Sequence, residues 1–188
     1  MAAALIELGD PPAAWARLGF APDEAGEVGL GEARLRLTGR GGGLLAVHAE
    51  GLTGDRPDGL ALARCERAPP ADVAHPNGAC AVDHVVVLTG SLARTVGALE
   101  AAGLDLRRRT EDGRMAFLRA GPFVLEVVER GGDPPRFWGL VVVVPRLEGL
   151  GPLVGPPKDA VQRGRRIATV SREAGLGTAL ALMTPRRT

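Results

Sequence analysis

One histidine and one glutamate interrupt two apolar, strand-like segments of the chain, and these two side chains could carry chemistry. His84 lies in segment 81–88 (AVDHVVVL), and Glu126 lies in segment 123–128 (FVLEVV). A carboxylate is costly to bury in such a strand unless it is paired, hydrogen-bonded or bound to an ion. Imidazole and carboxylate groups both bind metals and exchange protons. The two residues are therefore the first candidates for catalysis or metal binding.

Strand alternation predicts that both side chains point into one cavity. Alternate residues of a strand share a face, so the neighbours on these two faces can be identified from the sequence. They are all apolar: Val86, Leu88, Val124 and Val128. The expected site is thus one polar pair between apolar walls. A one-residue slip in register would move these side chains to the opposite face of the sheet.

These strands belong to an order of elements that recurs along the chain. Ser91 is a typical helix N-cap, and Gly103 a typical helix end. The order strand, helix, strand, strand, strand is predicted for residues 82–88, 91–102, 104–110, 114–120 and 123–129. A shorter copy is predicted as strand 137–144, helix 147–154 and strands 166–171 and 178–184. The weakest copy has strands 4–8, 26–30, 33–38 and 44–50 with a helix at 11–18.

The repeats predict an α+β protein built from βαβββ modules. We expect a degenerate module at 1–52, a linker at 53–79 and a core at 80–188 with two modules, 80–130 and 136–186. A single module leaves one sheet face and one edge open, so such modules are expected to pair. The core modules should form one curved mixed sheet with the helices outside. The first module should complete a sheet edge or pair with its copy in a homodimer.

The core resembles the vicinal oxygen chelate (VOC) superfamily, which includes glyoxalase-like, bleomycin-resistance and extradiol-dioxygenase proteins. The resemblance extends from His75 to Pro185 and is weaker before that. It rests on segments 82–87, 92–104, 116–119, 124–128, 136–140, 158–162 and 164–169. It implies paired modules curved into a half-barrel around a pocket. The members that the chain is most similar to include many without an assigned reaction.

The resemblance also implies where a metal would bind. The family takes one ligand from the first strand and one from the last strand of each paired module. Those positions match His84 and Glu126 in one module, but Gly139 and Ala181 or Leu182 in the other, where no side chain can ligate. Two protein ligands are fewer than the three usual for catalytic zinc. We expect no tightly bound metal, with His84 and Glu126 as ligands if zinc, nickel, iron or manganese binds.

Other interpretations of these histidines stay open. A neutral histidine can bond a carboxylate without any metal, so the alternative for His84 and Glu126 is a satisfied polar pair only. His48 or Glu50 would add a ligand if the first module packs against the middle one. His75 lies beside Pro76 and an Asn-Gly pair, which is typical of a turn.

Three residues of the last module are candidates for substrate binding. Trp138 opens a strand and would line an apolar pocket, although an aromatic there is more often core. Gln162 and Arg165 follow a loop rich in proline and glycine, where an arginine fork would hold a carboxylate or phosphate. The alternative is that the arginine is merely solvated.

Composition excludes several classes of function. The 188 residues carry a net charge of +1, without arginine clusters interleaved with aromatics, which makes nucleic acid an unexpected partner. The start of the chain is not typical of a signal peptide, and no segment approaches a membrane span. We therefore expect a cytoplasmic protein in which Cys65 and Cys80 are thiols.

The sequence leaves two functions. The first is a glyoxalase-like protein that binds, and as a lyase or isomerase converts, a small oxygen-bearing molecule, with His84 or Glu126 as base. The second is a non-catalytic protein of the bleomycin-resistance type that sequesters a drug or metabolite. The incomplete ligand set favours the second without excluding a metal-free enzyme.

Overall fold

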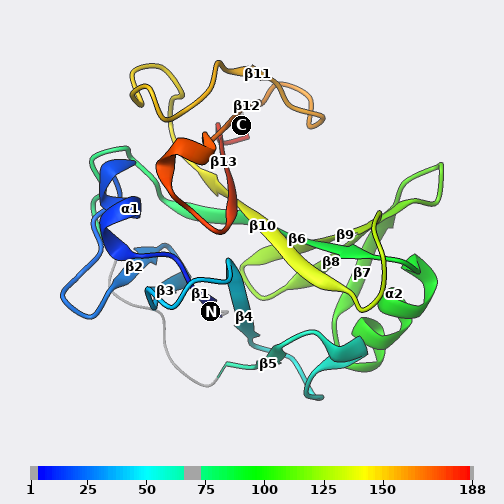
Figure 1. Ribbon diagram of the computed structural model, residues 1–188. Helices are drawn as coiled ribbons and strands as arrows, with labels where there is room; N and C mark the ends of the chain where they lie inside the picture. Colours follow the sequence, from blue (N-terminus) through cyan, green and yellow to red (C-terminus); the bar gives the residue numbers. More distant parts are fainter. Residues whose placement is uncertain (1–3, 66–72, 187–188) are drawn as a thin grey trace.

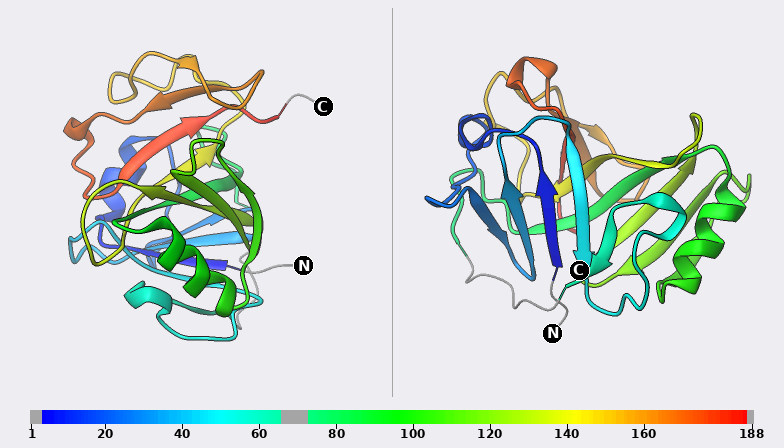
Figure 2. Two further views of the ribbon diagram at one scale, coloured as in Figure 1. Left: turned by 90° about the vertical axis from the view of Figure 1, so that its right-hand side faces the viewer. Right: turned by 60° about the horizontal axis from the view of Figure 1, so that its bottom comes forward.

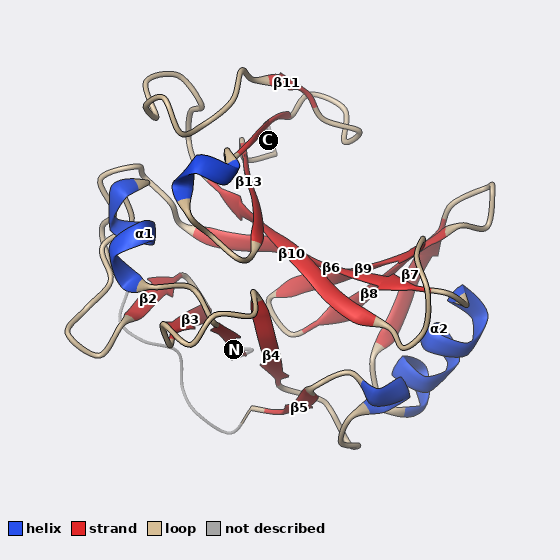
Figure 3. Ribbon diagram, in the orientation of Figure 1, coloured by secondary structure: helices blue, strands red, loops and turns tan. Residues whose placement is uncertain are grey.

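The computed structural model describes residues 4–65 and 73–186, and these residues form two β-sheets with few helices (Figure 1, Figure 3). The smaller sheet has the strand order β2-β3-β1-β4-β5, and the larger has β11-β12-β13-β10-β6-β9-β8-β7. The first half of the chain comprises β1 (Ala4–Leu8), α1 (Pro12–Arg17), β2 (Glu27–Leu30), β3 (Ala33–Leu37), β4 (Leu44–Ala49), η1 (Pro57–Gly59) and β5 (Leu62–Arg64). The rest comprises β6 (Ala81–Thr89), α2 (Leu92–Ala101), β7 (Asp105–Arg109), β8 (Met115–Ala120), β9 (Phe123–Glu129), β10 (Arg136–Val143), β11 (Lys158–Asp159), β12 (Arg166–Thr169), η2 (Arg172–Ala174) and β13 (Ala179–Met183).

The middle module has the predicted βαβββ order. Its strands are arranged β6-β9-β8-β7, and β6 runs parallel to β9. Ser91 caps α2, since its hydroxyl accepts a hydrogen bond from the Arg94 backbone N–H at 3.4 Å. The helix buries the face predicted from its periodicity, Leu92, Thr95, Val96 and Leu99. It covers one face of the sheet; the opposite face is called the inner face below.

The last module repeats the same strand order, β10-β13-β12-β11, and joins the middle one through the antiparallel pair β6–β10. The prediction of one mixed sheet from two modules is confirmed. The predicted helix at 147–154 is wrong, because this segment forms turns and an isolated bridge between Val154 and Val170. Gly149 and Gly151 adopt positive φ angles of 78° and 89°, which no α-helix contains.

The N-terminal segment forms a sheet of its own and does not extend an edge of the larger one. The strand that runs parallel to β1, as the last strand of a module does, is β3. β4, predicted as that last strand, instead pairs antiparallel with β1. The segment predicted as a linker, 53–79, contains η1 and β5, and β5 pairs parallel with β4. Residues 66–72 of that segment lie outside the described part. The antiparallel pair β1–β4, flanked by the parallel partners β3 and β5, repeats the pattern of β6–β10 flanked by β9 and β13.

The two sheets pack on each other within the one chain (Figure 2). Asp10 is 1% exposed, and its Oδ1 accepts hydrogen bonds from the backbone N–H groups of Gly177 and Thr178. His75, predicted to serve a turn, is also buried, and its ring bonds Ala21 and Gly29 at opposite nitrogens. Within the described residues, no helix is long and apolar enough to cross a membrane.

Candidate functional site

A β-bulge in β6 brings two neighbouring polar residues to the inner face. Val141 of β10 pairs with His84, but the next residue, Val142, pairs with Val82, so Asp83 is the extra residue of the bulge. Adjacent side chains of a regular strand point to opposite faces. The bulge breaks that alternation, and Asp83 Oδ2 lies 2.8 Å from His84 Nδ1. The two residues therefore act as one Asp–His pair.

Glu126 completes this group from the neighbouring strand. In β9 the side chains of Phe123, Leu125 and Val127 are buried, while Glu126 is partly exposed on the inner face. Glu126 lies opposite Val86 in the parallel pair β6–β9. Its Oε2 is 3.5 Å from His84 Nε2, so both ring nitrogens of the histidine face a carboxylate. The structure thus brings together the two residues singled out in the sequence.

Arg165 is the fourth member of the group. It precedes β12 and is only 3% exposed. Its Nη1 lies 2.6 Å from Asp83 Oδ1 in an ion pair, and its Nε donates a hydrogen bond to the Thr184 carbonyl at 2.7 Å. We call the series Arg165–Asp83–His84–Glu126 the polar line. It crosses the inner face from the last module to the middle one.

The two carboxylates of the polar line are perturbed in opposite directions. Burial alone would raise the pKa of Asp83, but the bonds and charges of His84 and Arg165 outweigh it and hold this pKa below its ordinary value. Burial raises the pKa of Glu126, and the charge of Asp83 adds to that effect, against the opposing charges of His84 and Arg108. Asp83 is therefore a fixed anion, whereas Glu126 retains its proton to a higher pH than an ordinary glutamate.

Arg108 places a second cation near Glu126. Arg108 of β7 pairs with Phe117 of β8, and Phe117 pairs with Glu126 of β9. The Arg108 guanidinium carbon lies 4.7 Å from the centre of the Phe117 ring, which is cation–π geometry. This exposed guanidinium is available to an anionic group of a ligand.

Sequence reasoning missed both Asp83 and Arg108. Strict alternation assigns Asp83 to the face of α2, and only its pairing with β10 reveals the bulge. A second irregularity between Leu106 and Arg108 in the β7–β8 pair likewise sets the register that puts Arg108 opposite Phe117. A charged residue next to a strand histidine was a usable signal for Asp83. The run of three arginines at 107–109 offered no means of choosing between them.

The other predicted substrate-binding residues are placed differently. Trp138 is 53% exposed at an irregularity of β10, and Gln162 lies in the β11–β12 turn, where its carbonyl accepts the Arg165 backbone N–H at 3.1 Å. Among these three residues, all within the described ranges, only Arg165 pairs through its side chain with Asp83. A depression of about 400 Å³ at the β11–β12 hairpin includes Arg165 but neither His84 nor Glu126 in its lining: Asp159, Ala160, Arg163, Gly164, Arg165 and Arg166.

The donors around His84 do not fit a divalent metal. In the middle module, Glu126 of β9 lies opposite Val86 of β6. At the equivalent place in the last module, Ala181 of β13 lies opposite Val141 of β10, so an alanine replaces the glutamate. A Cβ at Gly139 would lie 2.2 Å from the Ala179 carbonyl oxygen, which leaves no space for a ligating side chain. Across residues 4–65 and 73–186, no three His, Cys, Asp or Glu side chains are grouped as a metal site.

A comparison with solved structures shows a likeness over nearly the whole chain. The chain matches, with a TM-score of 0.62 and 10% identity, a xylose isomerase-like TIM barrel/4-hydroxyphenylpyruvate dioxygenase fusion protein, over 98% of this chain and 49% of that one. The chain thus spans about half the length of the fusion protein. Methylmalonyl-CoA epimerase from Mycobacterium tuberculosis matches with a TM-score of 0.46 and 16% identity, over 59% of this chain and 91% of that one.

A third similar structure is a variant of Streptomyces coelicolor methylmalonyl-CoA epimerase in complex with 2-nitronate-propionyl-CoA. It matches with a TM-score of 0.44 and 15% identity, over 56% of this chain and 97% of that one. No family model and no curated protein matches the sequence. The chain has the fold of the VOC superfamily.

Proposed function

We propose that this protein binds a small oxygen-bearing organic molecule on the inner face and moves a proton on it with His84 and Glu126. The observation that carries the proposal is the contact of His84 with a carboxylate at each ring nitrogen, 2.8 Å at Nδ1 and 3.5 Å at Nε2. Asp83, held as an anion, accepts the Nδ1–H bond and orients the ring. His84 Nε2 and Glu126 then form a pair that can exchange a proton.

The chemistry that suits this pair is proton transfer beside a carbonyl. Glu126, as the carboxylate, takes the proton from the carbon next to the carbonyl, and the C–H electron pair moves to the carbonyl oxygen as an enolate. His84, which has taken the Glu126 proton at Nε2 and so carries a proton on each ring nitrogen, donates a hydrogen bond to that oxygen. Return of the proton from Glu126 restores the carbonyl compound. The raised pKa of Glu126 suits this role, since a general base works best when its pKa approaches the ambient pH.

Arg108 supports an organic acid as the substrate class. Its guanidinium lies over Phe117, one strand from Glu126, and a carboxylate bound there would bring a 2-oxo or 2-hydroxy group toward the polar line. The inner-face neighbours Val86 and Val124 add apolar walls for a short carbon chain. We infer that small 2-oxo and 2-hydroxy acids are the first compounds to test.

A second candidate is a protein that binds such a molecule without converting it. The alanine and glycine at the other two ligand positions of the inner face favour this alternative. Binding needs only an apolar surface with a few placed polar groups. The two candidates predict the same ligand contacts but differ in proton exchange.

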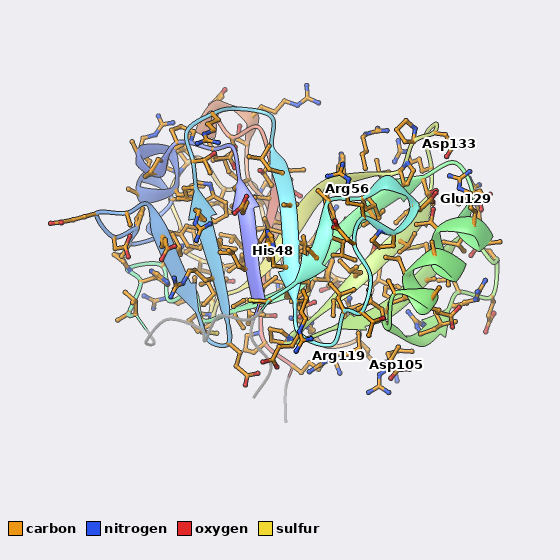
Figure 4. The ribbon with its side chains drawn as sticks, turned by 90° about the horizontal axis from the view of Figure 1, so that it is seen from below. His48, Arg56, Asp105, Arg119, Glu129 and Asp133 are labelled. Carbon is orange, nitrogen blue, oxygen red and sulfur yellow. The ribbon has the colours of Figure 1, made fainter. Side chains whose placement is uncertain are left out.

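Deuterium exchange distinguishes them. The protein is incubated in D2O with pyruvate or 2-oxobutanoate, and loss of the proton signal beside the carbonyl is followed by NMR against buffer alone. Enzyme-catalysed exchange is expected, and His84→Ala should lower its rate by about 10²-fold or more, the usual contribution of a general acid or base. His48→Ala on β4 of the smaller sheet is the matched control (Figure 4). Binding without exchange would favour the second candidate; neither binding nor exchange would contradict the proposed substrate class.

The remaining expectations from the sequence stay proposals. A cytoplasmic location, a homodimer and the lack of a nucleic-acid partner do not follow from the fold.

A further inference from the structure

We propose that Arg165 is a positioning residue that takes the place of a metal ion: through Asp83 it fixes the His84 ring as its Nδ1–H tautomer. The inference rests on the proposed function only for the role of the His84 ring in proton transfer. It concerns the resting protein and can be tested without a substrate.

Arg165 is buried with its charge paired. A guanidinium that is 3% exposed is retained in a protein only where an anion matches its charge. Within the described residues, its charge is matched by Asp83 at 2.6 Å, and its Nε donor by the Thr184 carbonyl at 2.7 Å. The Thr184 bond fixes where the guanidinium lies, and the guanidinium in turn fixes Asp83.

Hydrogen-bond chemistry determines which ring nitrogen of His84 carries the proton. An ionised carboxylate can only accept hydrogen bonds. Asp83 presents one oxygen to Arg165 and the other to His84, so the Nδ1 atom at 2.8 Å must be the donor. A neutral ring that carries its proton on Nδ1 has its lone pair on Nε2. The Nε2 atom, which faces Glu126, is then the basic nitrogen.

The polar line holds His84 in the way that a metal site would hold it. A metal ion bound at His84 would fix the same tautomer through a carboxylate behind the ring, and ion and carboxylate together would hold the histidine. Here the ring already faces Glu126 at Nε2, while Gly139 and Ala181 supply no further ligand. The positive charge is instead the guanidinium of Arg165, which pairs with the other oxygen of Asp83. The polar line therefore orders its histidine without an ion.

Imidazole NMR of the 15N-labelled protein tests the inference directly. The chain has three histidines, so the His84 signals can be assigned by their loss in His84→Ala. Spectra are recorded at about pH 8.5, where an ordinary imidazole is neutral. The wild type should show His84 with its proton on Nδ1. Arg165→Met should shift the population toward the Nε2–H form, and Asp83→Asn, whose amide can also donate, should shift it further.

Arg166→Met is the matched control. Arg166 is the next residue, is nearly half exposed and pairs with Glu148, so its loss removes one arginine from the same hairpin without touching the polar line. It should leave the His84 spectrum unchanged. If Arg165→Met does not fold, Arg165→Lys serves, since an ammonium cannot reproduce the fork that bonds both Asp83 and Thr184.

Two results would overturn the inference. An unchanged His84 tautomer in a folded Arg165→Met or Arg165→Lys protein would make Arg165 a structural ion-pair partner only. Stoichiometric binding of zinc, nickel or manganese to the wild type in equilibrium dialysis, with a shift of the His84 Nε2 signal, would show that the site uses an ion after all. Neither result depends on deuterium exchange, so failure of the proposed function alone leaves this test intact.

Discussion

At the scale of single residues, the site depends on two carboxyl groups whose pKa values are shifted in opposite directions. The sequence predicted His84 and Glu126 because a polar residue in an apolar strand needs a partner. The sequence could not predict that Asp83 and Arg165 belong to the polar line. Their places depend on a bulge and on a contact between residues 82 positions apart in the chain.

The raised pKa of Glu126 predicts a pH-dependent stability difference. A carboxyl group whose pKa is higher in the folded state contributes stability that is fully present below its unfolded pKa and is lost as pH rises through the folded pKa. Glu126→Gln cannot titrate. The free energy of unfolding of the wild type relative to Glu126→Gln should therefore fall as the pH rises from about 4, the unfolded pKa, through the raised folded-state pKa. Urea unfolding at a series of pH values measures it, and a difference that rises with pH would contradict the burial argument.

At the scale of elements, the middle module was predictable because its signals are local. Ser91 and Gly103 bound α2, and alternation defines β9. The helix at 147–154 was predicted from the repeated order of elements, but Gly149 and Gly151 in this segment adopt positive φ angles. The pairing of β4 with β1 was also hidden, since the direction of a short strand is set by its partners and not by its own residues.

The close approach of β10 and β13 predicts opposite effects for two glycine substitutions. Gly139→Ala would place a Cβ 2.2 Å from the Ala179 carbonyl and should destabilise the protein by about 1–3 kcal/mol, as overpacking does. Gly97→Ala in α2 meets nothing within 4 Å and should stabilise it by about 0.5–1 kcal/mol. Urea unfolding of both variants checks the signs, and a neutral Gly139→Ala would contradict the described register.

A polar clamp between η1 and α2 ties the first half of the chain to the larger sheet. Asp58 Oδ2 accepts a hydrogen bond from Thr95 Oγ1 at 2.6 Å, and its Oδ1 accepts one from Arg94 Nε at 3.0 Å. Arg94 also pairs with Asp133, which lies near Glu129 beside the start of α2 (Figure 4). Asp58→Ala should cost about 1–3 kcal/mol, because the buried Thr95 hydroxyl loses a partner. A loss below a few tenths of a kcal/mol in urea unfolding would show that the clamp is solvated.

At the scale of the whole molecule, both sheets should unfold together. Asp10 joins them, and one hydrophobic core runs through both. The chain has two tryptophans, of which Trp15 is buried in the N-terminal half and Trp138 is exposed. In a Trp138→Phe background, Trp15 fluorescence and far-UV circular dichroism should report one coincident transition. Two separate transitions would show that the sheets are independent units.

The structure removes the ground on which a homodimer was predicted. The predicted homodimer was inferred from an unpaired first module, but that segment forms a five-stranded sheet packed on its own chain. The homodimer stays a prediction, but an unpaired first module no longer supports it. Sedimentation equilibrium at micromolar concentration tests it, and a mass of 19.5 kDa would contradict it.

Substitution of Glu126 by glutamine separates ligand binding from proton transfer. Glu126→Gln keeps the size of the side chain and its place beside His84 but cannot take a proton. In a titration with 2-oxobutanoate, the dissociation constants of the two proteins should agree within about threefold. At a concentration that saturates both, deuterium exchange should be at least about 10²-fold slower in the variant. Equal exchange rates at equal occupancy would show that the His84–Glu126 pair moves no proton, and would contradict the account.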